Sequence, residues 1–126
     1  MCERSPIPCF LESSRPGAPW PSSATSRPVA GCTDVLPQLR LSKFKAQQLV
    51  DLSQFTELDF IEAKDNRISI GALVTYNSMQ FNSVLQAGAP DLVQAAASVG
   101  CRQTRNRGTL GGNLGNASPA GDSLPP

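Results

Sequence analysis

The sequence contains no histidine, and its four cysteines are nowhere separated by only two residues. Zinc and iron–sulfur sites are usually built from closely spaced Cys and His ligands. We therefore expect no metal site in this chain. The thiols of Cys2, Cys9, Cys32 and Cys101 are interpreted as structural or incidental.

The sequence also lacks an excess of charge of one sign and any long hydrophobic run. The formal net charge is +1, so the chain carries no basic field for a nucleic-acid partner. It has no run of about 18 apolar residues, the length that a membrane span needs. Residues 1–30 lack the apolar core of a secretory signal. We expect no nucleic-acid partner, no membrane span and a cytoplasmic protein.

Hydrophobic residues make up 40% of the 126 residues, which is typical of one globular domain. Proline and glycine are frequent and unevenly spread. Residues 1–28 hold six Pro and six Ser without a period of 2 or 3.6 residues, so they cannot bury a continuous face. We predict that residues 1–26 are a disordered or aberrant N-terminal segment and that residues 27–126 form the domain.

Strand and turn signals occur in the first half of this domain. An apolar stretch from Pro28 leads through a glycine turn into a helix at about residues 34–40, which Thr33 or Asp34 would cap. Residues 49–52 predict a short buried strand. Residues 60–63 and 67–70 flank the turn-forming triplet 64–66 and predict a β-hairpin.

Helix signals follow. Thr75 can cap a helix of about two turns that runs through Phe81. Pro90 stands at a favoured first helical position, apolar residues recur at spacings of three and four, and Gly100 ends the pattern. We therefore predict a second helix over residues 90–99.

Two glycine-containing segments are candidates for binding an anion. In residues 108–122, glycine amides could approach a pyrophosphate without an intervening Cβ, with Thr and Asn side chains as further partners. Residues 30–34, a glycine turn between a strand and a helix, are a smaller candidate of the same kind. By composition alone either segment could instead be an ordinary loop, and neither matches GxGxxG or a P-loop.

Charged residues near the second segment also leave alternatives open. Arg102, Arg105 and Arg107 are either a phosphate clamp or a solvated charge run. Asp122 either accepts a hydrogen bond from a ligand or caps the next turn. Tyr76 is interpreted as a packing residue.

Taken together, these segments resemble one family. The string is Ala30-Gly31-x-Thr33-Asp34, then Leu49-Val50-Asp51-Leu52, Ile70-Gly71-Ala72-x-x-Thr75, Arg105-Asn106-Arg107-Gly108-Thr109-Leu110-Gly111-Gly112-Asn113 and Ala117-Ser118-Pro119-Ala120-Gly121-Asp122. It is similar to the FAD-binding subunit of molybdenum hydroxylases of the xanthine dehydrogenase and carbon monoxide dehydrogenase type, over about residues 27–126. The resemblance implies an α+β, two-lobed, PCMH-type FAD-binding fold. We expect the end of a small α/β lobe to about residue 47, then most of a lobe with an antiparallel sheet and flanking helices, incomplete at both ends.

The resemblance also implies FAD as the cofactor and two loops that wrap it. The first loop would comprise Val29, Ala30, Gly31, Cys32, Thr33, Asp34 and Val35. The second would comprise Thr109, Gly111, Gly112, Asn113 and Asn116, with Asp122 further along the cofactor. Cys32 stands where the family commonly has a second glycine, so a side chain lies on a turn that can require positive φ.

The implied function is an electron relay. In this family electrons pass from a molybdenum centre through iron–sulfur clusters to the flavin, and then to an acceptor such as NAD, a quinone or oxygen. The molybdenum-cofactor subunit and the iron–sulfur subunit of the same complex are the implied partners. No catalytic acid, base or nucleophile is required of this chain. The alternative is an inactive, flavin-free fragment or a subunit-interaction module. A flavin oxidase of the vanillyl-alcohol oxidase type fits less well, since such enzymes usually attach flavin through His or Cys.

Overall fold

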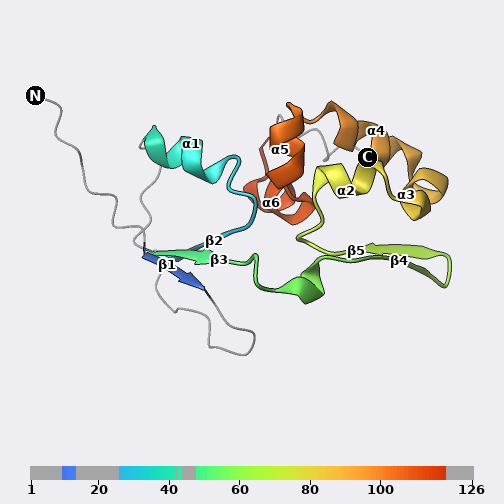
Figure 1. The fold of residues 1–126 in the computed structure, drawn as a ribbon, viewed down its shortest axis with the longest axis horizontal. Coiled ribbons are helices and arrows are strands. Elements are labelled where there is room, and N and C mark those ends of the chain that lie inside the picture. Colours follow the sequence, from blue (N-terminus) through green and yellow to red (C-terminus); the bar gives the residue numbers. More distant parts are fainter. Residues whose placement is uncertain (1–9, 14–25, 42, 44–47, 119–126) are drawn as a thin grey trace, which may run out of the picture.

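A computed structural model describes residues 10–13, 26–41, 43 and 48–118 of the chain. Asp122 and most of residues 1–26 lie outside these ranges. The described elements alternate strands with a helix in the first half, and helices dominate after residue 75 (Figure 1). This mixed architecture agrees with the predicted α+β class.

The first sheet has three parallel strands in the order β1-β3-β2. They are β1 (Phe10–Ser13), β2 (Ser26–Val29) and β3 (Gln48–Asp51). β3 is central and buries Leu49 and Val50. β2 is an edge strand, which explains how it accommodates Pro28 without losing a ladder hydrogen bond.

Two predictions for this region are wrong. The prediction that residues 1–28 form no regular element is wrong for residues 10–13 and 26–28. These lie in β1 and β2, whose backbone groups pair with β3, far away in the sequence. The boundary of the first lobe also does not fall at residue 47, because β3 is the centre of the first sheet. The short helix α1 (Val35–Arg40) follows β2 as predicted.

The predicted hairpin is confirmed. β4 (Ile61–Lys64) and β5 (Arg67–Ile70) pair antiparallel around Asp65 and Asn66. Both turn residues have positive φ, 50° and 60°, as a type I′ turn requires. One face of the hairpin packs on the main core through Ile61, Ile68 and Ile70.

Among the described residues, five helices follow the hairpin, and a 3-10 turn (Thr56–Leu58) precedes it. The helices are α2 (Tyr76–Gln80), α3 (Ser83–Gly88), α4 (Pro90–Ser98), α5 (Arg102–Arg107) and α6 (Leu110–Asn116). The predictions of α2 and α4 are confirmed. The hydroxyl of Thr75 caps α2 by accepting from the amide of Ser78 at 3.2 Å, and Pro90 begins α4. Nothing in the sequence analysis predicted α3, α5 or α6.

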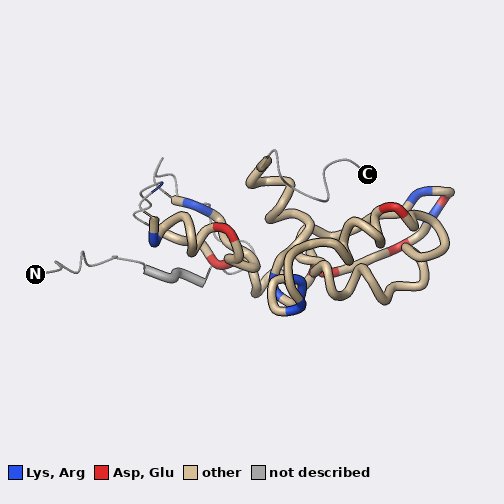
Figure 2. The backbone as a smooth tube through the Cα atoms, turned by 90° about the horizontal axis from the view of Figure 1, so that it is seen from above, with Lys and Arg blue, Asp and Glu red and all other residues tan. Residues whose placement is uncertain are grey.

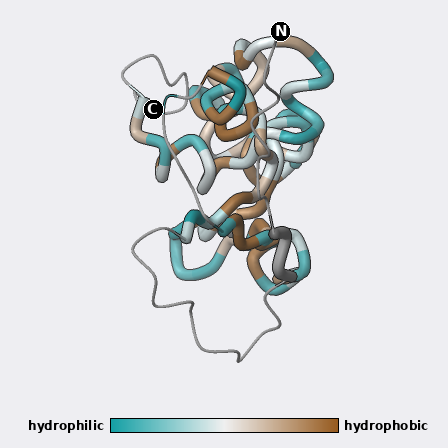
Figure 3. Tube along the Cα trace, turned by 90° about the vertical axis from the view of Figure 1, so that its left-hand side faces the viewer, coloured by the Kyte–Doolittle hydropathy of each residue, from teal (hydrophilic) through white to brown (hydrophobic). Residues whose placement is uncertain are grey.

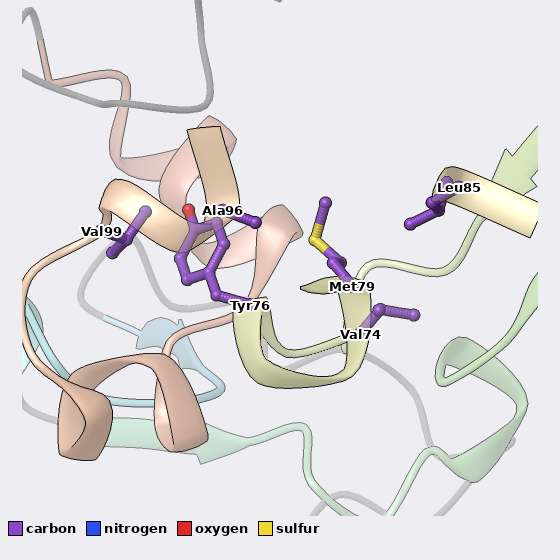
Figure 4. Packing of buried hydrophobic residues seen from close by; sticks show 6 residues of the cluster. All are labelled: Val74, Tyr76, Met79, Leu85, Ala96 and Val99. Atoms are coloured by element: carbon purple, nitrogen blue, oxygen red, sulfur yellow. The ribbon is translucent and has the colours of Figure 1, made fainter. Parts of the chain in front are cut away.

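The main core lies between the hairpin and helices α2, α3 and α4. Its buried members are Val74, Tyr76, Met79, Leu85, Ala96 and Val99 (Figure 4). Hydrophobic segments run through the middle of the molecule and hydrophilic ones along its margins (Figure 3). Fully burying a Val, Leu or Met side chain stabilises a fold by about 1.5–3 kcal/mol. Tyr76 is buried in this core and is a packing residue, as predicted.

Within the described ranges, no helix is both long and apolar enough to cross a membrane. The same ranges contain no group of three or more His, Cys, Asp or Glu residues that could hold a metal ion.

Candidate functional site

The first glycine segment is a tight turn between β2 and α1. Cys32 has φ 61°, in the left-handed region that was anticipated for this position. Its thiol donates to the carbonyl oxygen of Ala30 at 3.6 Å. Asp34 occupies the N-cap position of α1, but its carboxylate makes no capping hydrogen bond, so the predicted side-chain cap by this residue is wrong.

This turn has a backbone that glycine would favour. Cys32 is left-handed and, two residues later, Asp34 is right-handed at the N-cap of α1. Among the residues that the structure describes, no acceptor bonds the amides of Gly31 or Thr33. The turn therefore offers donors to a group from outside it.

The described part of the second glycine segment, residues 108–118, is mostly helical. Residues 108–111 run along residues 72–76, with the Gly111 amide donating to the Ala72 carbonyl at 2.9 Å. Gly111 is required by this close approach, since a Cβ there would lie 2.6 Å from the Cβ of Ala72. Thr109 then caps α6, its hydroxyl accepting from the amide of Gly112 at 3.1 Å.

The expectation that residues 108–122 form a loop of free glycine amides is therefore wrong for the described part of the segment. The amides of Gly111, Gly112 and Asn113 all bond within the chain, to Ala72, Thr109 and Thr109 respectively. Docking on residues 72–76 and the Thr109 cap outweigh the low helix propensity of glycine, which costs about 1 kcal/mol per residue. Thr109, whose hydroxyl was predicted to bind the anion, is buried.

The fold brings the two glycine segments into contact (Figure 1). A Cβ built on Gly31 would overlap the carbonyl oxygen of Arg107, and it would lie 3.0 Å from the Cα of Gly108. On the far side of the turn, the side-chain amide of Asn116 donates to the Asp34 carboxylate at 3.4 Å. The side-chain amide of Gln38 donates to the Asn116 carbonyl oxygen at 3.3 Å.

The arginines next to the second segment have different roles. Arg105 donates from Nη1 to the carbonyl oxygens of Val99 and Gly100, at 3.0 and 3.1 Å, and so stabilises the end of α4. This structural role matches neither the clamp nor the solvated run. Arg102 and Arg107 are exposed, and Figure 2 shows the basic residues of α5 gathered near the middle of the molecule in that view.

Cys101 is the exposed residue that precedes α5. Its sulfur lies 3.4 Å from the hydroxyl oxygen of Thr104. This hydrogen bond is the main reason that the pKa of the Cys101 thiol lies below its ordinary value.

A protein-family model matches residues 20–126 of the chain, and it describes the FAD binding domain in molybdopterin dehydrogenase. The chain belongs to this family. The match begins at residue 20, within the segment that we predicted to precede the domain.

Relatives agree with this assignment. The chain is 34% identical over 97 residues to the glyceraldehyde dehydrogenase medium chain of Sulfolobus acidocaldarius, a match that covers 77% of the chain and 34% of that protein. It is 36% identical over 99 residues to the xanthine dehydrogenase FAD-binding subunit of Escherichia coli O157:H7, covering 78% and 34%. The chain spans about one third of the length of the curated relatives it matches.

A solved structure confirms the predicted fold. Reconstituted CO dehydrogenase from Oligotropha carboxidovorans matches with a TM-score of 0.77 and 28% identity, over 79% of this chain and 35% of that one. The resemblance to the xanthine and carbon monoxide dehydrogenase family is confirmed, and so is FAD as the cofactor of the family to which the chain belongs.

Two of the predicted first-loop residues thus meet the second segment: Gly31 lies against Arg107 and Gly108, and Asp34 is bonded to Asn116. Residues 29–35 form the end of β2, the turn and the start of α1, and residues 109–116 form the cap and body of α6. Asp122 lies outside the described residues. Sequence reasoning missed Gln38, although its position four residues after Asp34 places both on one face of a helix.

Proposed function

We propose that this chain binds FAD at the contact between its two glycine segments, with the diphosphate on the turn at residues 30–34. The observation that carries the proposal is the approach of Gly31 to Arg107 and Gly108, which joins segments far apart in sequence. The turn there contains the left-handed Cys32, and the amides of Gly31 and Thr33 have no acceptor among the described residues, which leaves them to bind an anion. Gly31, which has no Cβ, is the residue of the turn that meets the second segment.

The residues divide into donors and supports. The backbone amides of Gly31, Cys32 and Thr33 would bind phosphate oxygens, while Val29, buried at 3% exposure, anchors the strand that leads to them. On the second segment, Thr109 holds α6 in place and Gly111 allows it to approach residue 72. The proposed site comprises Val29, Ala30, Gly31, Cys32, Thr33, Asp34, Val35, Thr109, Gly111, Gly112, Asn113, Asn116 and Asp122.

We further propose that the chain is part of a flavin subunit of a molybdenum hydroxylase. FAD, when bound, supplies the electron-transfer chemistry between iron–sulfur clusters and an external acceptor such as NAD, a quinone or oxygen. The chain's own part is to hold and orient the cofactor. A molybdenum-cofactor subunit and an iron–sulfur subunit are the proposed partners, in the cytoplasm; the medium-chain and FAD-subunit names of the relatives support this role.

The test compares two glycine substitutions in the full chain. Gly31→Ala places a Cβ onto the Arg107 carbonyl, whereas Gly115→Ala in α6 meets no atom within 4 Å. Titration of FAD, followed by quenching of flavin fluorescence, should show binding by the original chain and by Gly115→Ala. The affinity of Gly31→Ala should fall by about tenfold or more, equivalent to about 1.4 kcal/mol.

A folded original chain that does not bind FAD would refute the proposal. It would favour the alternative of a flavin-free fragment or subunit-interaction module. Equal FAD affinity in both glycine variants would show that the FAD site does not depend on the contact at Gly31.

A further inference from the structure

Asp34 and Gln38 on α1 and Asn116 at the end of α6 form a side-chain bridge between the two glycine segments. We propose that this bridge holds the segments at the separation that FAD requires, so that these three are positioning residues. The inference rests on the proposed function. It assigns a role to Gln38 and gives Asn116 a partner within the chain.

The bridge has a defined polarity. An ionised Asp34 carboxylate only accepts hydrogen bonds, so Asn116 must present its NH₂ group to Asp34. Its carbonyl oxygen then faces Gln38, which must donate in turn. Asp34 therefore determines the orientation of both amides, and each end of the Asn116 carboxamide is bound to α1.

The bridge and the glycine contact lie at opposite ends of the turn at residues 30–34. Gly31 meets Arg107 and Gly108 before the second segment enters α6, and Asn116 meets α1 where α6 ends. Two attachment points define the angle of α6 to α1, which a single point cannot do. The amides of the turn lie between them.

The bridge can be removed in variants without loss of the fold. The two hydrogen bonds measure 3.3 and 3.4 Å, longer than the usual 2.7–3.2 Å, and Asp34 is exposed. Bonds of this kind stabilise a fold less than the ordinary buried bond does. Losing them should leave the fold intact and change how the segments are held.

A double-mutant cycle on FAD affinity tests the bridge without changing its charge. Gln38→Met and Asn116→Ala should each weaken binding by about threefold, and the double substitution should weaken it no further than the weaker single variant. Gln94→Met on α4 is the matched control, because Gln94 is exposed and lies outside the bridge. It should bind FAD as the original chain does.

An exchange of groups tests the polarity. Asn116→Asp sets a second carboxylate beside Asp34, and FAD binding should weaken by about tenfold as the two negative charges repel. Adding Asp34→Asn restores one carboxylate and one carboxamide, so the double variant should return to within about threefold of the original affinity. Asn106→Asp, which adds the same charge at an exposed position in α5, should have little effect. Circular dichroism of each variant checks that it is folded.

The outcomes separate the two proposals. If the original chain fails to bind FAD, the proposed function falls and the inference falls with it. If the original chain binds FAD, additive effects of Gln38→Met and Asn116→Ala, or no recovery on adding Asp34→Asn to Asn116→Asp, would overturn the bridge alone.

Discussion

Replacing Cys32 by glycine should stabilise the chain, since this residue holds a left-handed backbone conformation with φ 61°. A side chain in this region costs about 1–2 kcal/mol, because its Cβ approaches the following carbonyl oxygen. Glycine removes this cost but loses more backbone entropy on folding, about 0.5–1 kcal/mol. The thiol hydrogen bond to Ala30, at 3.6 Å, adds little, because a thiol is a weak donor. The net expected gain is about 0.5–1 kcal/mol from these two opposing terms.

Urea unfolding under reducing conditions measures this gain as a higher midpoint with an unchanged slope. For a domain of this size it corresponds to a rise in Tm of about 2–8 °C. Cys32→Ala is the matched control, since it removes the sulfur and keeps the Cβ. Its stability should stay at or slightly below that of the original chain. A loss of stability in Cys32→Gly, or an equal gain in Cys32→Ala, would refute the reasoning from φ.

Three further perturbations follow from the geometry. Ala117 caps the end of α6 with φ 46°, so Ala117→Gly should raise the unfolding free energy by about 0.5–1 kcal/mol, and a lower urea midpoint would contradict this. Thr109→Ala should lower it by about 1 kcal/mol through loss of the cap on Gly112, while Thr109→Ser, which keeps the hydroxyl, should retain most of that stability in the same assay. Thr104→Val should raise the pKa of Cys101, so the pH dependence of its alkylation by iodoacetamide, followed by mass spectrometry, should shift to higher pH; an unchanged profile would exclude Thr104 as the cause.

Elements with strong local signals were predictable. The Asp65-Asn66 turn, the Thr75 cap and Pro90 each favour one backbone geometry through contacts within a few residues, and each appears where it was expected. Both glycine segments of the candidate site were also located, because glycine-rich strings stand out from their surroundings. The FAD-binding family follows from the order of those strings.

Elements that depend on distant partners were not predictable in the same way. β1 exists through pairing with β3, thirty-eight residues further along the chain by their register, Phe10 with Gln48. α6 has the composition of a loop and becomes helical by docking on residues 72–76. Arg105, for which a phosphate clamp and a solvated charge run were both left open, binds the end of α4 instead.

The sequence by itself determined the family, the two glycine segments and the unusual side chain at position 32, because these depend on residue types in order along the chain. Only the tertiary structure decided that Gly31 rests against Arg107, that the glycine amides of α6 bond within the chain, and that Asn116 lies between Asp34 and Gln38. The physical reason is that backbone donors and side-chain amides bond to whatever acceptor the folded chain brings near. Sequence spacing does not encode that proximity between residues some eighty positions apart.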